Sequence, residues 1–528
     1  MEIRFLFIFR NGGLPIRQTP LYLGRALLLA LLLCSARKMQ ACDQLPSGQT
    51  LWVRLSTPVS TYTAKPGDPI HAVLTRDLVC GDDVLLPAGS SVEGAVLSKR
   101  KVGFGIRHET AALELVFNHA ITSTGNTIPL AARVEEVENA RESVRDGVIQ
   151  GIRSSNTFQG SISSSLIHLP TWNLYSDPIL MVFKAAFPIF PEPEIHYPAG
   201  TDLRIKTTET FSPPPGAVAH DFVAQDPTPD AQLDQLIDQL PTRVVTKKNV
   251  DADVINLVFI GSEQMIHSAF HNAGWASSDP VSHRAVMKNL YALLNNSGYR
   301  QEPMTIFYLD GVPEDMNWQK SLNSYDRRDH LRIWQWRSEG YAQPVWISSS
   351  THDTGAVLAI KHKGFMHHIA PNIDEERSAV VRDLSFAGCV QSVRYVSRSS
   401  SPVSLINATG DVMHTDNAVA VIKFKDCHPD FPQPGAEPAS YKPGNHLFRF
   451  ARRQILTFRN DIFRANIIYG SYQGTRMALT AMRHSSSTLP GTPASPPYTP
   501  AREAFTGVYS DPIDSKVPRR PYQLRTIH

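Results

Sequence analysis

The stretch VINLVFIGSEQMIHSAFHNAG, residues 254–274, decides the fold of the larger part of this chain. It begins with the apolar run 254–260, which is typical of a buried strand. Gly261 and Ser262 then open a helix, with Ser262 at the favoured N-cap position, and Gly274 ends it. The residues expected on the buried face of the helix are Met265, Ile266, Ala269, Phe270 and Ala273. The stretch therefore predicts a buried strand followed directly by an amphipathic helix.

Further strands and helices come after this unit. Asp279 and Pro280, in N-cap and N1 order, predict a second helix. Asn372 and Glu375 have the spacing of a capping box, which predicts a helix from Asn372 to about Ala387. The apolar stripe expected on the second helix is Val286, Leu290, Leu293 and Leu294, and strands are expected at 305–309, 330–336, 344–350, 390–396 and 418–424. Residues 246–430 are thus predicted to form an α/β (α+β) sandwich domain, with antiparallel hairpins rather than a regular doubly wound sheet.

The preceding part of the chain is rich in short strands. Alternating apolar segments separated by Gly, Pro and Asp turns occur at 51–55, 70–74, 113–117, 128–134 and 201–205. Several short strands at this spacing indicate an all-β barrel or sandwich, here over residues 42–210. Clustered prolines predict a linker over 211–245, in which the amphipathic stretch 231–240 would pack on the α/β domain. The fold class is therefore multidomain, with an N-terminal all-β barrel/sandwich followed by the α/β domain.

Composition and the N-terminal residues bear on where the protein resides. The chain has 528 residues with 52 Lys+Arg against 49 Asp+Glu, a net charge of +3, which excludes a bulk basic nucleic-acid binder. Arg10, Arg17 and Arg25 precede the apolar block 26–36, so residues 1–41 are predicted to be a secretory signal peptide. Two alternatives stay open: an uncleaved signal anchor, and a lipid anchor at Cys42 after the lipobox-like residues 39–42. Each places the protein in the periplasm or attached to the envelope.

The cysteines fit an exported chain. Removal of residues 1–41 leaves Cys42, Cys80, Cys389 and Cys427. Four cysteines in an exported protein predict two disulfides, for which the sequence allows three connectivities. Equal separations favour one disulfide in each half, Cys42–Cys80 and Cys389–Cys427. Lipidation of Cys42 would exclude the first of these, and four buried thiols are the remaining alternative.

Several separated motifs in the second half occur together in a known family. They are VFIGSE at 258–263, AGW at 273–275, RDHLRIW at 328–334, VWI at 345–347, THD at 351–353 and HIAPNIDEER at 368–377. In this order they resemble the LssY C-terminal domain family over residues 249–426. In other members this domain follows phosphatase-like membrane regions, but the Ser-Arg and His pattern of that phosphatase does not occur here. The resemblance therefore implies a domain type without a settled activity.

The first half carries a second resemblance. Residues 70–94 contain a strand, a Pro-Gly turn and another strand, in a run similar to the barrel of TrbI-type conjugation-channel proteins. This resemblance implies a β-barrel and an envelope setting, and no secretion role is carried over from it.

A set of polar residues in the second domain is the main candidate for chemistry. If residues 361–364 form a turn, the following strand folds back and brings His368 towards His352. The candidate metal or acid–base cluster comprises His330, His352, Asp353, His368, Asp374 and Glu376. Imidazoles with a carboxylate suit Zn²⁺ or another divalent metal, the cofactor that such a cluster would hold. The alternative is a structural network, in which Asp374 and Glu376 are favoured by the dipole in the first turn of a helix.

Two other segments give weaker signals. Gly261 and Ser262 could bind an anion through free amide groups, but a lone turn of this type is a weak signal and ordinary helix capping is the favoured interpretation. Residues 348–353 contain Ser, His and Asp, but neighbouring strand side chains point to opposite faces and do not form a catalytic triad.

Residues 431–484 combine a Pro-rich segment with a basic amphipathic helix, which would lie on a membrane surface or dock on the α/β domain. Residues 485–528 are predicted to be a disordered tail.

Two functions fit these observations. The first is a non-enzymatic envelope protein in which the two domains bind an envelope protein or a membrane-surface partner, without nucleic acid. The second is a metal-dependent envelope hydrolase that uses the cluster of His352, His368 and Asp374. The first needs no compact catalytic motif, and none occurs in the sequence. The sequence leaves open the ligand, the oligomeric state and whether the protein is an enzyme.

Overall fold

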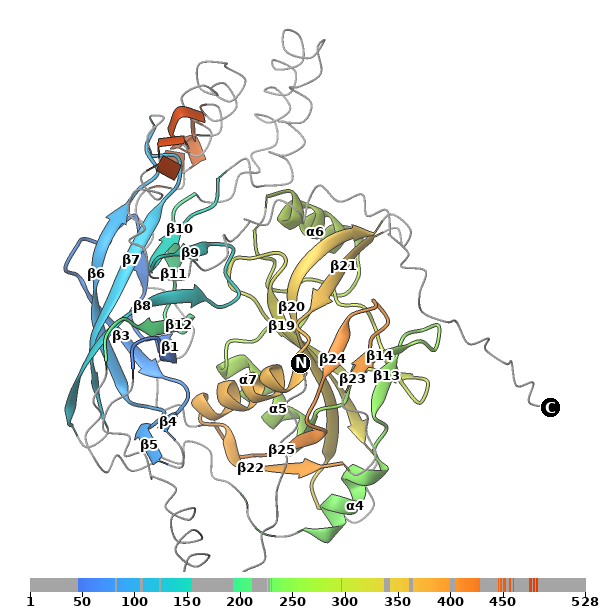
Figure 1. Ribbon diagram of the computed structural model, residues 1–528. Coiled ribbons are helices and arrows are strands. Elements are labelled where there is room, and N and C mark those ends of the chain that lie inside the picture. The colour runs from blue at the N-terminus through green and yellow to red at the C-terminus, as the bar shows by residue number, and fades with distance from the viewer. Residues whose placement is uncertain are drawn as a thin grey trace, which may run out of the picture.

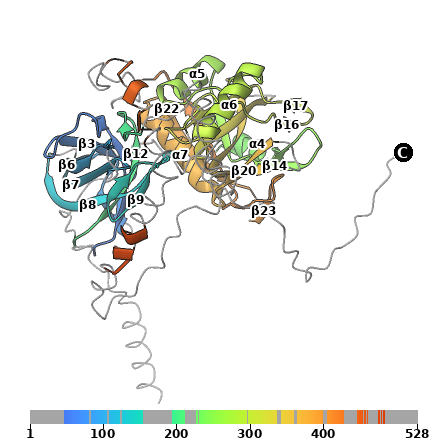
Figure 2. The same cartoon turned by 90° about the horizontal axis from the view of Figure 1, so that it is seen from above.

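We describe the protein from a computed structural model (Figures 1 and 2). It describes residues 46–80, 83–104, 108–122, 125–153, 193–210, 230–295, 297–336, 342–359, 364–398 and 404–427, together with residues 226 and 228 and scattered residues between 445 and 482. The signal peptide, Cys42 and the tail lie outside the described residues, as do the side chain of Cys80 and most of the Pro-rich linker. In the part described, no helix combines the length and apolar character needed to cross a membrane.

The first domain is a closed six-stranded barrel, as predicted. Its strands are hydrogen-bonded in the order β6-β3-β1-β12-β8-β7, and β6 also pairs with β7, which closes the ring. They are β1 (Thr50–Leu55), β3 (Pro69–Leu74), β6 (Ser91–Arg100), β7 (Ala112–Ile121), β8 (Thr127–Val137) and β12 (Asp202–Thr207). Alternate residues such as Leu51, Val53 and Leu55 fill the interior. The intervening Arg54 therefore points out of the barrel.

Shorter strands accompany the barrel. The hairpin of β9 (Ser143–Arg145) and β10 (Val148–Gln150) continues the sheet beside β7. Two further pairs are β2 (Val59–Ser60) with β11 (His196–Tyr197), and β4 (Leu78–Cys80) with β5 (Asp83–Leu86).

The second domain is built on a mixed seven-stranded sheet, which confirms the α/β prediction. Its order is β18-β19-β20-β15-β25-β22, with β21 paired to the far part of β20. Among these ladders only β15–β25 is parallel. The strands are β15 (Leu257–Ile260), β18 (Met316–Lys320), β19 (Arg328–Trp336), β20 (Val345–Ala359), β21 (Gly364–Ile369), β22 (Val390–Ser397) and β25 (Ala418–Phe424).

The two faces of this sheet pack against different elements. Leu257 and Phe259 share one apolar cluster with helices α5 (Glu263–Asn272) and α7 (Ile373–Phe386). Val258 and Ile260 point the other way and pack with α4 (Ala231–Gln239) and Val244. Strands β13 (Arg243–Val245), β14 (Asp251–Val254), β16 (Tyr308–Leu309) and β17 (Val312–Pro313) form a small sheet, and β23 (Ser404–Ile406) pairs with β24 (Val412–His414). Helix α7 faces the barrel (Figures 1 and 2).

Two helix starts differ from prediction. Helix α6 (His283–Asn295) begins after Ser282, whose hydroxyl accepts from the backbone N–H of Ala285 at 3.1 Å. Asp279 does not cap it because its carboxylate is bound by Lys288 and Tyr299. Val286 and Leu290 of the expected buried stripe are 53% and 40% exposed. The stripe therefore holds only in part, through Leu293.

The predicted capping box of α7 is also absent. Asn372 precedes the helix but makes no side-chain capping bond. Its backbone instead forms an isolated bridge with His414, and the carboxylate of Glu375 binds Arg76 of the barrel. The contact between the domains takes the place of the local cap.

The C-terminal segment docks on the barrel rather than on the α/β domain. Arg452 donates to Glu194 at 2.6 Å and to the carbonyl of Val102. Leu456 is buried in the apolar cluster of the barrel. These contacts correct the expectation that this segment would pack on the α/β domain.

Candidate functional site

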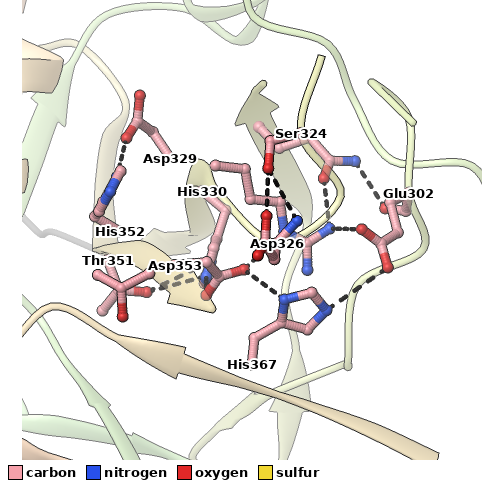
Figure 3. Close-up of polar contacts among 12 residues, drawn as sticks. Glu302, Ser324, Asp326, Asp329, His330, Thr351, His352, Asp353 and His367 are labelled. Carbon is pink, nitrogen blue, oxygen red and sulfur yellow. Dashed lines mark hydrogen bonds and ion pairs between the residues drawn. The ribbon is translucent and has the colours of Figure 1, made fainter. Parts of the chain in front are cut away.

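The predicted polar cluster is divided between the two faces of the sheet. Asp329 on β19 lies opposite His352 on β20, on the face that α7 covers. His330 and Asp353 follow them in sequence and therefore point to the other face, because strand side chains alternate. Figure 3 shows His352 directed at Asp329, and His330 and His367 directed at Asp353. Adjacent residues in the sequence thus belong to two separate groups.

The first group consists of Asp329, His352 and Glu376. Nδ1 of His352 lies 2.6 Å from Oδ1 of Asp329. Glu376 comes from α7 and is 3% exposed. Each of the three offers one donor atom, and these atoms lie within 4.8 Å of one another. The structure therefore joins two of the predicted residues, His352 and Glu376, to Asp329, which is not among the predicted residues.

Charges in this group are unevenly distributed. Burial opposes the ionisation of Asp329, but hydrogen bonding to His352 and the charges of His352 and Lys320 hold its pKa below its usual range. Burial and the adjacent Asp329 raise the pKa of Glu376 well above its usual value. Burial lowers the pKa of His352, yet Asp329 outweighs it and the net shift is upward. These shifts favour the ionised form of Asp329 and the neutral form of Glu376.

The second group is a closed network around Asp353, which is 1% exposed. Its carboxylate accepts from Arg328 Nε at 2.8 Å and lies 2.9 Å from His330 Nε2. Arg328 also donates to Glu302 at 2.8 Å, and His367 lies between Glu302 and Asp353. Burial opposes ionisation of Asp353, but the charges of His330, His367 and Arg328 hold its pKa well below its usual range. Such a compensated network is typical of a structural role.

The remaining predicted residues lie elsewhere. Nδ1 of His368 lies 2.7 Å from Asp411. The strand does fold back, but His368 is opposite Gly355, not His352. Asp374 accepts from Thr415 and from the backbone N–H of Asp416, which ties the start of α7 to the loop between β24 and β25. The structure therefore does not bring His368 or Asp374 to the group of Asp329, His352 and Glu376.

Gly261 and Ser262 have ordinary structural roles. The Ser262 hydroxyl accepts from the backbone N–H of Met265 at 3.2 Å, as an N-cap does. The carbonyl of Gly261 accepts from the indole of Trp346 at 3.0 Å. These contacts account for both residues without a bound anion.

A small pocket lies between the two domains, on the α7 side of the sheet. Asp329 lines it, so the first group adjoins the domain interface. Its charged lining comprises three cationic and four acidic side chains: Arg54, Lys320, Arg382, Glu138, Asp202, Asp329 and Asp383. Because burial raises the pKa of Glu138 to about 7, the positive and negative charges of the lining are close to balanced near neutral pH.

Four of these side chains join the domains. Arg54 of the barrel donates to Asp202 at 2.6 and 2.7 Å and also binds Asp383 of α7. Lys320 Nζ lies 3.2 Å from Asp202 and 2.6 Å from Asp383. Nearby, Nδ2 of Asn139 in the barrel donates to Asp329 at 2.7 Å. A buried charge cluster and a hydrogen bond therefore connect the barrel to the candidate site.

Sequence reasoning missed this interface. Arg54 and Asp383 are separated by 329 positions, and no local pattern marks such a pair. Asp329 was within reach, however, since it precedes His330 in the RDH motif. Strand alternation places Asp329 on the face opposite to that of His330. On that face, the register of β19 with β20 puts Asp329 opposite His352.

Glu138 makes the interface sensitive to pH. Burial and the charges of Asp202 and Asp329 raise its pKa from an ordinary 4.5 to about 7, while Arg382 and Lys320 oppose this shift. Because the folded protein holds the proton of Glu138 more tightly than the unfolded chain does, the free energy of unfolding falls as pH rises from 4.5 to about 7. Below pH 4.5 the side chain is neutral in both states and this loss is absent. We expect Glu138→Gln to leave stability unchanged at pH 4.5.

At pH 8 the same variant should gain about 3 kcal/mol over the wild type, since a pKa difference of one corresponds to about 1.4 kcal/mol and the pKa of Glu138 rises from 4.5 to about 7. Urea unfolding at the two pH values measures the difference. Glu135→Gln, on β8 shortly before Glu138, controls for the removal of a more exposed carboxylate. A variant no more stable than the wild type at pH 8 would show that burial does not raise the pKa of Glu138 in the folded protein.

Comparison with known proteins identifies one domain. Residues 237–419 match the family model described as the LssY C-terminus, which confirms the resemblance seen in the sequence. Among solved structures the chain is similar to ComB10 of the Com type IV secretion system of Helicobacter pylori, with 16% identity, a TM-score of 0.21, and coverage of 33% of this chain and 93% of that one. No curated protein matches the chain.

Proposed function

We propose that this chain is an exported cell-envelope protein that works by binding, with its barrel and its LssY-type domain acting as one unit. The observation that carries the proposal is the charge cluster of Arg54, Asp202, Lys320 and Asp383. All four side chains neutralise one another across the interface. Their role is to hold the domains together as one binding unit.

The disulfide supports export. Cys389 and Cys427 are bonded, as the equal-separation argument predicted. Disulfides persist in oxidising compartments such as the periplasm and are rare in the cytosol. The basic and apolar pattern of residues 1–41 points to the same destination.

Fractionation of the cells that produce the protein tests this location. We expect the full-length chain, followed with an antibody, in the periplasmic or membrane fraction. Alkylation before reduction should leave Cys389 and Cys427 unmodified. A cytosolic chain in which both thiols react with the alkylating reagent would contradict export.

A further inference from the structure

The group of Asp329, His352 and Glu376 combines one imidazole with two carboxyl groups at the domain interface. We propose that these three side chains bind a divalent transition-metal ion of the zinc type. This metal site is separate from the binding role proposed above. It adjoins the pocket through Asp329, and it can be tested on the purified protein without a partner.

The donor set selects the class of metal. Imidazole nitrogen with carboxylate oxygen suits Zn²⁺ and similar ions, whereas Mg²⁺ and Ca²⁺ prefer oxygen ligands alone. Bonds of about 2.0–2.2 Å to zinc place ligand atoms roughly 3.3–3.6 Å apart in a tetrahedral site. The three donor atoms already lie within 4.8 Å of one another. Small side-chain rotations would therefore complete the arrangement.

Glu376 supplies an independent observation. Its side chain is buried, at 3% exposure. Its carboxyl group is hydrogen-bonded to that of Asp329, and its Oε1 atom accepts no hydrogen bond from the residues that the structure describes. Buried polar atoms are almost always satisfied, so an unpaired carboxyl oxygen beside a second carboxylate calls for a ligand. A bound cation would satisfy this oxygen and stabilise the carboxylate form of Glu376 beside Asp329.

The surroundings hold the three side chains in place. Asp329, His352 and Glu376 come from β19, β20 and α7, whose packing forms the core of the domain. Asn139 donates to Oδ2 of Asp329 at 2.7 Å, which leaves Oδ1 directed at the group. Such outer contacts typically orient metal ligands. Because Asn139 belongs to the barrel, the proposed ion would also strengthen the contact between the domains.

Metal content of the purified protein tests the site. The protein is stripped with a chelator, dialysed against Zn²⁺ and then against metal-free buffer, and analysed by mass spectrometry of the elements. We expect about one zinc per chain in the wild type, and at least a tenfold loss of affinity in Glu376→Gln and His352→Gln. Zinc should raise the melting temperature of the wild type but not that of the two variants.

His368→Gln is the matched control. It also removes an imidazole hydrogen-bonded to a carboxylate, Asp411, but lies outside the group. It should retain zinc like the wild type. A wild type that keeps no zinc would overturn the proposal, as would undiminished zinc in both site variants.

If either variant fails to fold, zinc-loaded wild-type crystals give the answer. An anomalous scattering peak within bonding distance of Asp329, His352 and Glu376 would support the site. A peak elsewhere, or none, would refute it.

Discussion

Replacing Asp383 with alanine is expected to lower the free energy of unfolding by about 3–5 kcal/mol, the usual effect of removing one partner from a buried ion-pair cluster. Its carboxylate binds Arg54 of the barrel, Lys320 at 2.6 Å and the indole N–H of Trp275 at 2.9 Å. The change would leave two buried cations sharing Asp202 alone. Because one of them belongs to the barrel, we also expect the two domains to unfold in separate transitions. Calorimetry measures both effects.

Asp251→Ala is the control for this experiment. Asp251 also pairs with an arginine, Arg243 at 3.3 Å, but its side chain is 65% exposed. Exposed pairs contribute about 1 kcal/mol or less. A loss for Asp383→Ala no larger than this would mean that the cluster does not join the domains.

Removal of the Cys389–Cys427 disulfide is the second large effect that we expect. The crosslink closes a loop with a sequence separation of 38. Closing a loop of this length lowers the entropy of the unfolded chain, which stabilises the folded protein by about 4 kcal/mol. The double variant Cys389→Ala with Cys427→Ala should therefore unfold at a much lower urea concentration. Since Cys389 is fully buried, part of the loss would come from packing.

Reduced wild-type protein separates the two contributions. It lacks the crosslink but keeps both sulfur atoms. We expect it to lose most of the stability that the double variant loses. Equal stability of oxidised and reduced wild type would contradict a structural role for the disulfide.

Local patterns were sufficient to predict much of the fold. The helix forms with Ser262 and Gly274 in their predicted roles, because these signals act within a few residues. The strand predicted over 254–260 is divided, since Val254 ends β14 in the small sheet and only residues 257–260 form β15 in the main sheet. Predictions failed where a distant contact replaced a local one. Glu375 binds Arg76 of the barrel instead of capping α7, and Asp279 binds Lys288 and Tyr299 instead of capping α6.

The candidate site was predictable only in part. The sequence indicated His352 and Glu376, but it grouped them with His330 and Asp353, which strand alternation places on the opposite face. The contribution of the barrel could not be anticipated. Asn139 and Asp329 are 190 positions apart, and only the packing of two domains brings them together.

A double-mutant cycle of Arg54→Ala and Asp383→Ala tests the central claim most directly, namely that the barrel and the LssY-type domain form one unit around this site. Unfolding free energies of the wild type, both single variants and the double variant give the coupling between the two side chains. Residues in direct contact couple by about 0.5–3 kcal/mol. We predict a value of about 2 kcal/mol, because both side chains are buried. Strictly additive effects of the two substitutions would contradict a direct contact between the domains.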